Sequence, residues 1–193
     1  EIVNSEWAEM DFTNRLWRIP ASKMKMSRDH IVPLSPQAIA VLEVMRPYSG
    51  EGDLVFPGHK TKSPTLARET LVVALRRMGF GKDEVCAHVF RAMASTLLNE
   101  LGYPPDVIER QLAHVPGNRV RAAYNRAEYL PERRKMMDEW AEYLDALRET
   151  ERRLLAGELD LVYVAPERLL GERFLGLLDR LDREGRIALF AID

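Results

Sequence analysis

The sequence predicts two unlike pieces: a mainly α-helical domain with a small antiparallel β-sheet over residues 1–148, and a truncated strand–helix–strand (βαβ) piece of an α/β domain over residues 149–193. Short alternating segments before residue 35 predict the sheet, and amphipathic patterns after it predict the helices. Two continuous apolar runs, 161–164 and 187–192, are typical of strands buried on both faces. The composition, 46% hydrophobic and 30% charged, is that of a globular protein.

The predicted sheet follows a helix end at residues 1–7. Residues 11–14 favour a turn, and a second turn is expected at Arg28 and Asp29. The segments on either side of these turns are short and extended in pattern. The three expected strands are residues 16–19, 22–26 and 30–34.

Helices are expected from residue 36 to residue 147. Ser35 followed by Pro36 is a strong helix start, and that helix should run to about Met45. Gly102 is expected to end the long central helix, because glycine readily adopts the left-handed conformation that follows many helices. The other expected helices are 65–78, 88–101, 105–113, a segment carrying Tyr124, and 131–147.

Five polar residues, taken in order, suit the cutting of a phosphodiester by a side chain. That reaction needs a nucleophile, positive charge or hydrogen-bond donors on the phosphate, and a proton donor for the leaving oxygen. Tyr124 offers a phenolic oxygen, and the planar fork of Arg91 can contact two phosphate oxygens. His88 and Arg91 are three residues apart and share a helix face. His114 can donate a hydrogen bond, and Lys25 can protonate the leaving oxygen.

Each of these residues, taken alone, is more often an ordinary surface or core residue, so the prediction depends on their combination. The net charge of −2 gives no general reason to expect a nucleic-acid partner. A DNA surface must therefore be a local patch of basic residues. Arg76 and Arg77 are better explained as solvent-exposed side chains on a helix. The expected DNA contacts are Lys23, Arg28, Arg119, Arg121 and Arg126.

The order Lys, His-x-x-Arg, His, Tyr resembles the catalytic domain of tyrosine recombinases, specifically prophage-type integrases. The neighbouring segments Trp17-Arg18-Ile19-Pro20, His30-Ile31-Val32-Pro33-Leu34-Ser35 and Ala122-Ala123-Tyr124-Asn125-Arg126 resemble that family as well. The resemblance covers residues 1–148. It implies site-specific DNA recombination or integration, in which a strand of double-stranded DNA is cleaved at an attachment site and rejoined.

The resemblance also implies a role for each matched residue. Tyr124 would attack the phosphate and form a 3′-phosphotyrosine link, while Arg91 and His114 stabilise the transition state. Lys25 would be the general acid, and His88 would assist proton transfer. The family works without ATP or a metal, so no cofactor is expected, and its members act as oligomers on DNA. No group of residues in the sequence has metal-ligand spacing.

One part of the family pattern lies outside this sequence. The first catalytic arginine of the family stands in a Thr-Gly-x-Arg-x-Gly-Glu segment, and Glu1 matches the last residue of that segment. Loss of one charge-stabilising group of this kind costs about 10²–10³ in rate. The 193 residues are therefore expected to form a poor or inactive recombinase. The alternative is a DNA-binding fragment without catalytic activity.

Residues 150–193 resemble a fragment of a RecQ-type DNA helicase. Residues 157–170 and 187–193 carry this resemblance, and Asp193 matches the first residue of the acidic box with which that family handles Mg²⁺ and ATP. The phosphate-binding loop of the family is absent from the sequence. A fusion of two fragments is the hypothesis, with part of an ATP-dependent DNA helicase as the third functional alternative.

Cysteine content and apolar runs indicate the cellular compartment. Cys86 is the one cysteine, so no disulfide can form within the chain and a reducing compartment is expected. Residues 1–7 lack the pattern of a signal peptide, and no apolar run is long enough to span a membrane. The sequence predicts a cytoplasmic protein without membrane partners.

Overall fold

The computed structural model describes residues 1–25, 27–58, 65–82, 86, 88–114, 128–162, 164 and 172–187. The chain divides into two compact units, Glu1–Ala141 and Glu142–Asp193. The predicted domain boundary at residue 148 stays a prediction.

A three-stranded antiparallel sheet, in the order β1-β2-β3, lies near the beginning of the first unit. Two 3₁₀ helices precede it, η1 (Ile2–Asn4) and η2 (Trp7–Glu9). The strands are β1 (Met10–Asp11), β2 (Leu16–Ile19) and β3 (His30–Pro33). The pairing of Ile19 with His30 closes a long loop between β2 and β3.

The strand predicted at residues 22–26 is wrong. The 3₁₀ helix η3 (Ala21–Lys23) and a turn occupy the described part of that segment. Local hydrogen bonds explain the difference, because the Ala21 amide donates to the Asp29 carboxylate at 2.8 Å. The Ser27 amide donates to the Met24 carbonyl at 3.0 Å, and Ser27 has a φ of 46°. These contacts satisfy backbone groups that a strand would pair across a ladder.

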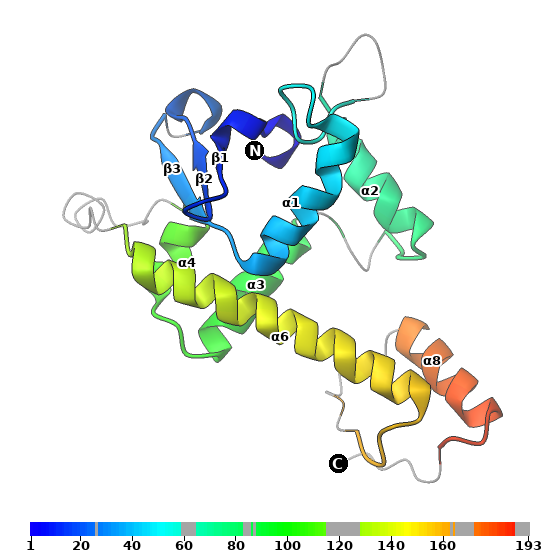
Figure 1. Ribbon diagram of the computed structural model, residues 1–193. Helices are drawn as coiled ribbons and strands as arrows, with labels where there is room; N and C mark the ends of the chain where they lie inside the picture. Colours follow the sequence, from blue (N-terminus) through cyan, green and yellow to red (C-terminus); the bar gives the residue numbers. More distant parts are fainter. Residues whose placement is uncertain are drawn as a thin grey trace. The chain divides into compact units, whose positions relative to one another are not determined.

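The six described α-helices confirm the mainly helical prediction (Figure 1). The Ser35 side chain caps the first of them by accepting from the Ala38 amide, as predicted. Gly102, with a φ of 84°, ends the third. The helices are α1 (Pro36–Ser49), α2 (Arg68–Arg77), α3 (Val89–Glu100), α4 (Pro105–Gln111), α6 (Leu130–Ala156) and α8 (Glu172–Arg183).

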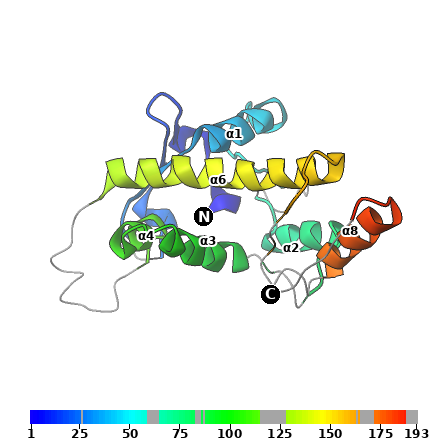
Figure 2. The same ribbon diagram turned by 90° about the horizontal axis from the view of Figure 1, so that it is seen from below.

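Two hydrophobic clusters hold the first unit together. Leu34, Leu42 and Val55 form one between the sheet and α1, with Trp7 and Trp17 packed against it. The other joins α3, α4 and the beginning of α6, which lie side by side in Figure 2. Its buried members are Leu98, Val107, Ile108 and Met136. This helical cluster holds α3 and α4 together, and the candidate site residues lie at the beginning of α3 and just after the end of α4.

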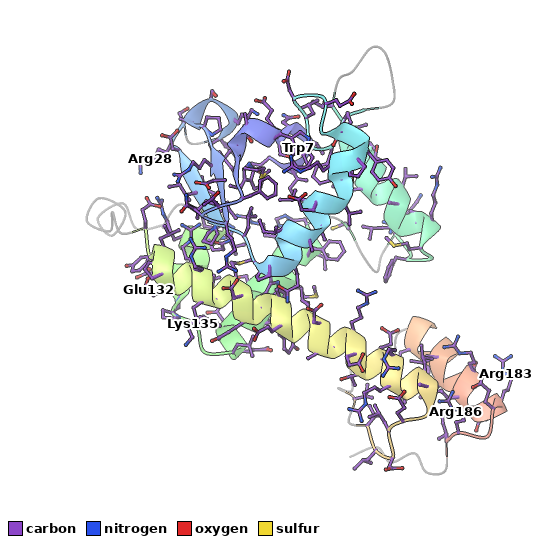
Figure 3. The ribbon with its side chains drawn as sticks, viewed as in Figure 1. Trp7, Arg28, Glu132, Lys135, Arg183 and Arg186 are labelled. Atoms are coloured by element: carbon purple, nitrogen blue, oxygen red, sulfur yellow. The ribbon has the colours of Figure 1, made fainter. Side chains whose placement is uncertain are left out.

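The second unit contains the end of α6 and α8. Arg186, labelled in Figure 3, donates to the carbonyls of Leu154 and Leu155 and so satisfies the end of α6. The strand predicted at residues 161–164 does not form at the described positions 161, 162 and 164, and Leu161 is 70% exposed. A strand buried on both faces needs neighbouring strands, and the described part of this unit contains none. The strand predicted at 187–192 lies outside the described residues apart from Ile187, which is not in a strand.

Among the described residues, no helix combines the length and apolar character needed to cross a membrane.

Candidate active site

The first half of the site is the beginning of α3. His88 is the N-cap residue of this helix, and Arg91 lies one turn further along. The Arg91 amide donates to the His88 carbonyl at 3.1 Å, so the predicted His-x-x-Arg motif is one helical turn. Leu98, 2% exposed in the helical cluster, anchors the other end of α3.

The second half of the site is the turn that ends α4. The His114 amide donates to the Glu109 carbonyl at 2.9 Å, and the Ala113 amide donates to the Arg110 carbonyl at 3.2 Å. This pair of bonds is a Schellman motif, which requires a left-handed residue at the position of Ala113. Ala113 has a φ of 53°, and the motif directs His114 back toward its own helix.

Replacing Ala113 by glycine is expected to stabilise the protein by about 1 kcal/mol, because an L-residue pays about 1–2 kcal/mol in the left-handed region and glycine does not. Thermal unfolding should show this as a rise of about 3 °C in Tm. The matched control is Gly102→Ala at the corresponding position of α3, where a new Cβ meets no atom within 4 Å and only the backbone cost remains. Tm changes of the same sign in both variants would contradict this account.

Arg91 and His114 meet although they are far apart in sequence. The Nε of Arg91 lies 3.1 Å from the Nε2 of His114, and a second Arg91 nitrogen donates to the Leu112 carbonyl. The Nδ1 of His114 lies 2.7 Å from the Oε2 of Glu109. Arginine can only donate, so Nε2 of His114 is the acceptor and Nδ1 carries the proton that Glu109 accepts. The structure thus assigns one tautomer of His114, held from both sides.

These side chains surround a surface pocket of about 290 Å³. Arg91, His114 and His88 supply its basic and polar groups, and Ser95 and Thr96 add hydroxyl groups. Arginine and hydroxyl groups donate hydrogen bonds to phosphate oxygens. This set of donors suits a phosphate. In the described part of the chain, no group of three or more metal-binding side chains gathers.

Lys25 and Arg28 lie on the loop between β2 and β3 and are exposed (Figure 3 labels Arg28). Neither side chain lines the pocket formed by His88, Arg91 and His114. The structure therefore brings together three of the five predicted catalytic residues and leaves Lys25 apart from them.

Lys23, predicted as a DNA contact, makes its bonds within the protein. Its Nζ lies 2.6 Å from a Glu6 carboxylate oxygen, 2.5 Å from Glu9 and 2.9 Å from the Asn4 carbonyl. Burial alone would lower the pKa of Lys23, but the bonds to Glu6 and Glu9 outweigh it and the pKa lies above its usual value. A phosphate would have to replace one of these partners. The network instead holds the beginning of the loop that carries Lys25.

Replacing Glu9 by glutamine is expected to destabilise the protein by about 2 kcal/mol near neutral pH, because Glu9 accepts charge-assisted bonds. Burial would raise the pKa of Glu9, but bonds from Lys23, Trp17 and the Glu6 amide hold it below its ordinary value of 4.5. A lowered carboxyl pKa stabilises the fold above pH 4.5, and this stabilisation is lost as the pH falls through the folded-state pKa. Urea unfolding should show that the free energies of unfolding of the wild type and of Glu9→Gln become equal as the pH is lowered.

The control for this measurement is Glu43→Gln, because Glu43 is exposed and its ion pair with Arg46, one turn away on α1, is exposed as well. That variant should unfold like the wild type at every pH. A Glu9→Gln variant whose deficit stays constant into acid would contradict the proposed role of the carboxylate charge.

Four predicted site residues lie outside the described residues: Tyr124, Arg119, Arg121 and Arg126. The described ends of their segment are His114 and Glu128. Sequence reasoning missed Glu109, Ser95 and Thr96. The signal for Glu109 is its position five residues before His114, the spacing that a Schellman turn brings together.

Comparisons with known proteins identify the family of the chain. The phage integrase family matches residues 1–130. Prophage integrase IntA of Escherichia coli (strain K12) is 44% identical over 171 residues, which are 89% of this chain and 40% of IntA. The integrase of Enterobacteria phage P4 is 45% identical over 160 residues, 75% of this chain and 36% of that protein. No solved structure matches. The chain belongs to the phage integrase family, a family of tyrosine recombinases.

The chain spans about 40% of the length of these curated relatives. The similarity to IntA extends over 171 residues and so must continue past residue 148. Part of the region predicted as a separate piece is therefore aligned with an integrase.

Proposed function

We propose that this chain carries the strand-cleaving site of a site-specific recombinase, which joins DNA to Tyr124 through a 3′-phosphotyrosine. The observation that carries the proposal is the meeting of Arg91 and His114 in one pocket with His88. In the sequence, the segment with Tyr124 follows His114. The substrate class is double-stranded DNA at attachment sites, bound by an oligomer.

In the proposed cleavage step, the Tyr124 phenol oxygen bonds to phosphorus as the bond to the 5′ oxygen breaks. Arg91 and the hydroxyl groups of the pocket donate to the phosphate oxygens, whose charge grows in the transition state. His88 accepts the phenol proton, and the Lys25 ammonium gives its own proton to the leaving 5′ oxygen. The reverse attack by a 5′ hydroxyl of another strand restores the phosphodiester, so no external energy source is needed.

Glu109 gives this mechanism a positioning residue. Its carboxylate accepts the Nδ1 proton of His114 and so keeps Nε2 on the pocket side, beside Arg91. In this tautomer Nε2 accepts from Arg91, so His114 orients the guanidinium that donates to the phosphate. Lys25 approaches only if DNA bound at the pocket also contacts the β2–β3 loop, where Arg28 supplies further positive charge.

The test is covalent trapping on nicked duplex DNA of randomised sequence. Loss of the short nicked fragment prevents rejoining, so even slow cleavage accumulates as a complex that survives denaturing detergent. The wild type should accumulate it and Tyr124→Phe should not, while the control Tyr48→Phe, at a tyrosine that is 79% exposed, should match the wild type. DNA that binds without forming Tyr124-dependent complexes would favour the non-catalytic alternative. Sequencing the captured DNA would also identify the preferred site.

The helicase alternative depends on the resemblance of residues 150–193 alone. The described positions of the first predicted strand there are not in a strand, and Leu161 is largely exposed. DNA-stimulated hydrolysis of ATP by the chain is the result that would favour that alternative.

A further inference from the structure

A completely buried arginine lies near the beginning of α6. Arg133 is 0% exposed, whereas its neighbours Glu132 and Lys135 lie on the exposed face of the helix (Figure 3). A buried guanidinium loses its hydration and therefore needs hydrogen-bond acceptors around it. Burial, followed by the nearby Arg110 charge, lowers the pKa of Arg133 to about 10, which leaves it charged at neutral pH.

The acceptors of Arg133 come from three separate parts of the fold. Its Nε donates to the Gln111 side-chain oxygen at 2.9 Å, and one terminal nitrogen donates to the Glu128 carbonyl at 3.2 Å. The other terminal nitrogen donates to the carbonyl of Ile31 on β3. A Glu128 carboxylate oxygen lies 3.8 Å from the guanidinium and completes an ion pair.

Two of these partners lie on either side of the segment that contains Tyr124. Gln111 ends α4, three residues before His114, and Glu128 is the first described residue after the segment that contains Tyr124. Arg110 also pairs with Glu128, with its Nε 3.2 Å from a carboxylate oxygen. The buried His30 ring lies 3.3 Å from the Gln111 carbonyl, to which its Nε2 donates. His30, Arg110, Gln111, Glu128 and Arg133 are called the anchor cluster below.

We propose that the anchor cluster is the positioning device of the tyrosine segment. Its contacts hold Gln111 and Glu128, which lie on either side of that segment in the sequence, against β3 and α6, and it thereby fixes where the segment begins and ends. This inference depends on the proposed function. Its physical basis is that a reacting group held in the wrong place by about 1 Å can lose about 10²-fold in rate. Arg133 and Gln111 are positioning residues and do not contact DNA.

A purely structural role of the cluster makes a different prediction. Loss of stability alone would lower the amount of folded protein and would not change the chemistry of each bound complex. A positioning role instead lowers the rate of cleavage in DNA-saturated protein and loosens the backbone locally. These two readouts separate the possibilities.

The experiment uses the intact chain with two substitutions. Gln111→Leu removes the side-chain oxygen that accepts from Arg133, and Gln111→Glu keeps an accepting oxygen at that position. The control Val55→Ala opens a cavity in the other hydrophobic cluster and touches no anchor residue. Hydrogen exchange is measured at residues 112–114 and 128–133, and covalent complex formation is measured at saturating nicked DNA. Gln111→Leu should speed exchange in both stretches and slow complex formation about tenfold, with an unchanged half-saturating DNA concentration.

Gln111→Glu should restore both readouts toward the wild type, and Val55→Ala should change neither. Exchange at wild-type rates in Gln111→Leu would overturn the inference, as would normal complex formation despite faster exchange. If the wild type forms no covalent complex, the proposed function fails. The exchange result then decides alone whether the cluster holds the ends of the segment.

Discussion

Replacing Arg91 by alanine is expected to lower the rate of covalent attachment to DNA by about 10²–10³-fold. The substitution removes a donor from the phosphate pocket and also the Nε–H group that lies 3.1 Å from His114. Both losses act on the transition state, so DNA affinity should change much less than the rate. Single-turnover trapping on nicked DNA measures the rate, and a filter-binding titration measures the affinity.

The role of Arg91 can be separated from that of Lys25 with a modified substrate. A 5′-bridging phosphorothiolate leaves as a thiolate, which needs no general acid. Lys25→Ala should regain most of its cleavage rate on this substrate, whereas Arg91→Ala should remain slow. Arg91→Lys keeps the charge but not the planar fork, so it should remain well below the wild type. An Arg91→Ala variant that cleaves at the wild-type rate would contradict the assignment of the pocket.

Replacing Arg133 by methionine is expected to destabilise the first unit by about 3 kcal/mol. Methionine fills part of the space but leaves the Gln111 oxygen and the carbonyls of Ile31 and Glu128 without their donor. Each buried polar group left unsatisfied costs about 1–3 kcal/mol, and partial access of water reduces the sum. Urea unfolding followed by circular dichroism measures the loss.

The neighbouring Arg134 provides a matched control. Its bond to the Asn14 carbonyl, at 2.9 Å, is exposed, so Arg134→Met should cost about 0.5 kcal/mol or less. Equal stability of Arg133→Met and Arg134→Met would contradict the account of the anchor cluster. It would mean that the buried guanidinium contributes no more than a surface side chain.

Local signals predicted most of the fold. Ser35 with Pro36 marks the start of α1, and Gly102 marks the end of α3, because caps depend on neighbouring residues only. The β2–β3 loop was predicted wrongly, since its shape depends on the Asp29 carboxylate binding the Ala21 amide across the loop. Alternation of residue types carries no information about such a bond. The strand at 161–164 was expected from apolar character alone, and its neighbours decide whether a strand can form.

The site was predictable in its residue types and less so in its geometry. His88, Arg91 and His114 could be chosen from order and spacing, and the structure brings them to one pocket. Lys23 looked like a free basic residue, because no local pattern shows that Glu6 and Glu9 fold back onto it. Arg133 lies in a charged run that favours an exposed helix face. Its burial follows only from the meeting of β3, α4 and α6.

The most direct measurement is to locate the covalent bond itself. Complexes trapped on nicked DNA are digested with nuclease and protease, and the nucleotide-bearing peptide is sequenced by mass spectrometry. We expect a single modified peptide, with a nucleotide attached through its 3′ phosphate to the Tyr124 oxygen. DNA attached to any other residue, or stable binding without a covalent link, would show that Tyr124 is not the nucleophile.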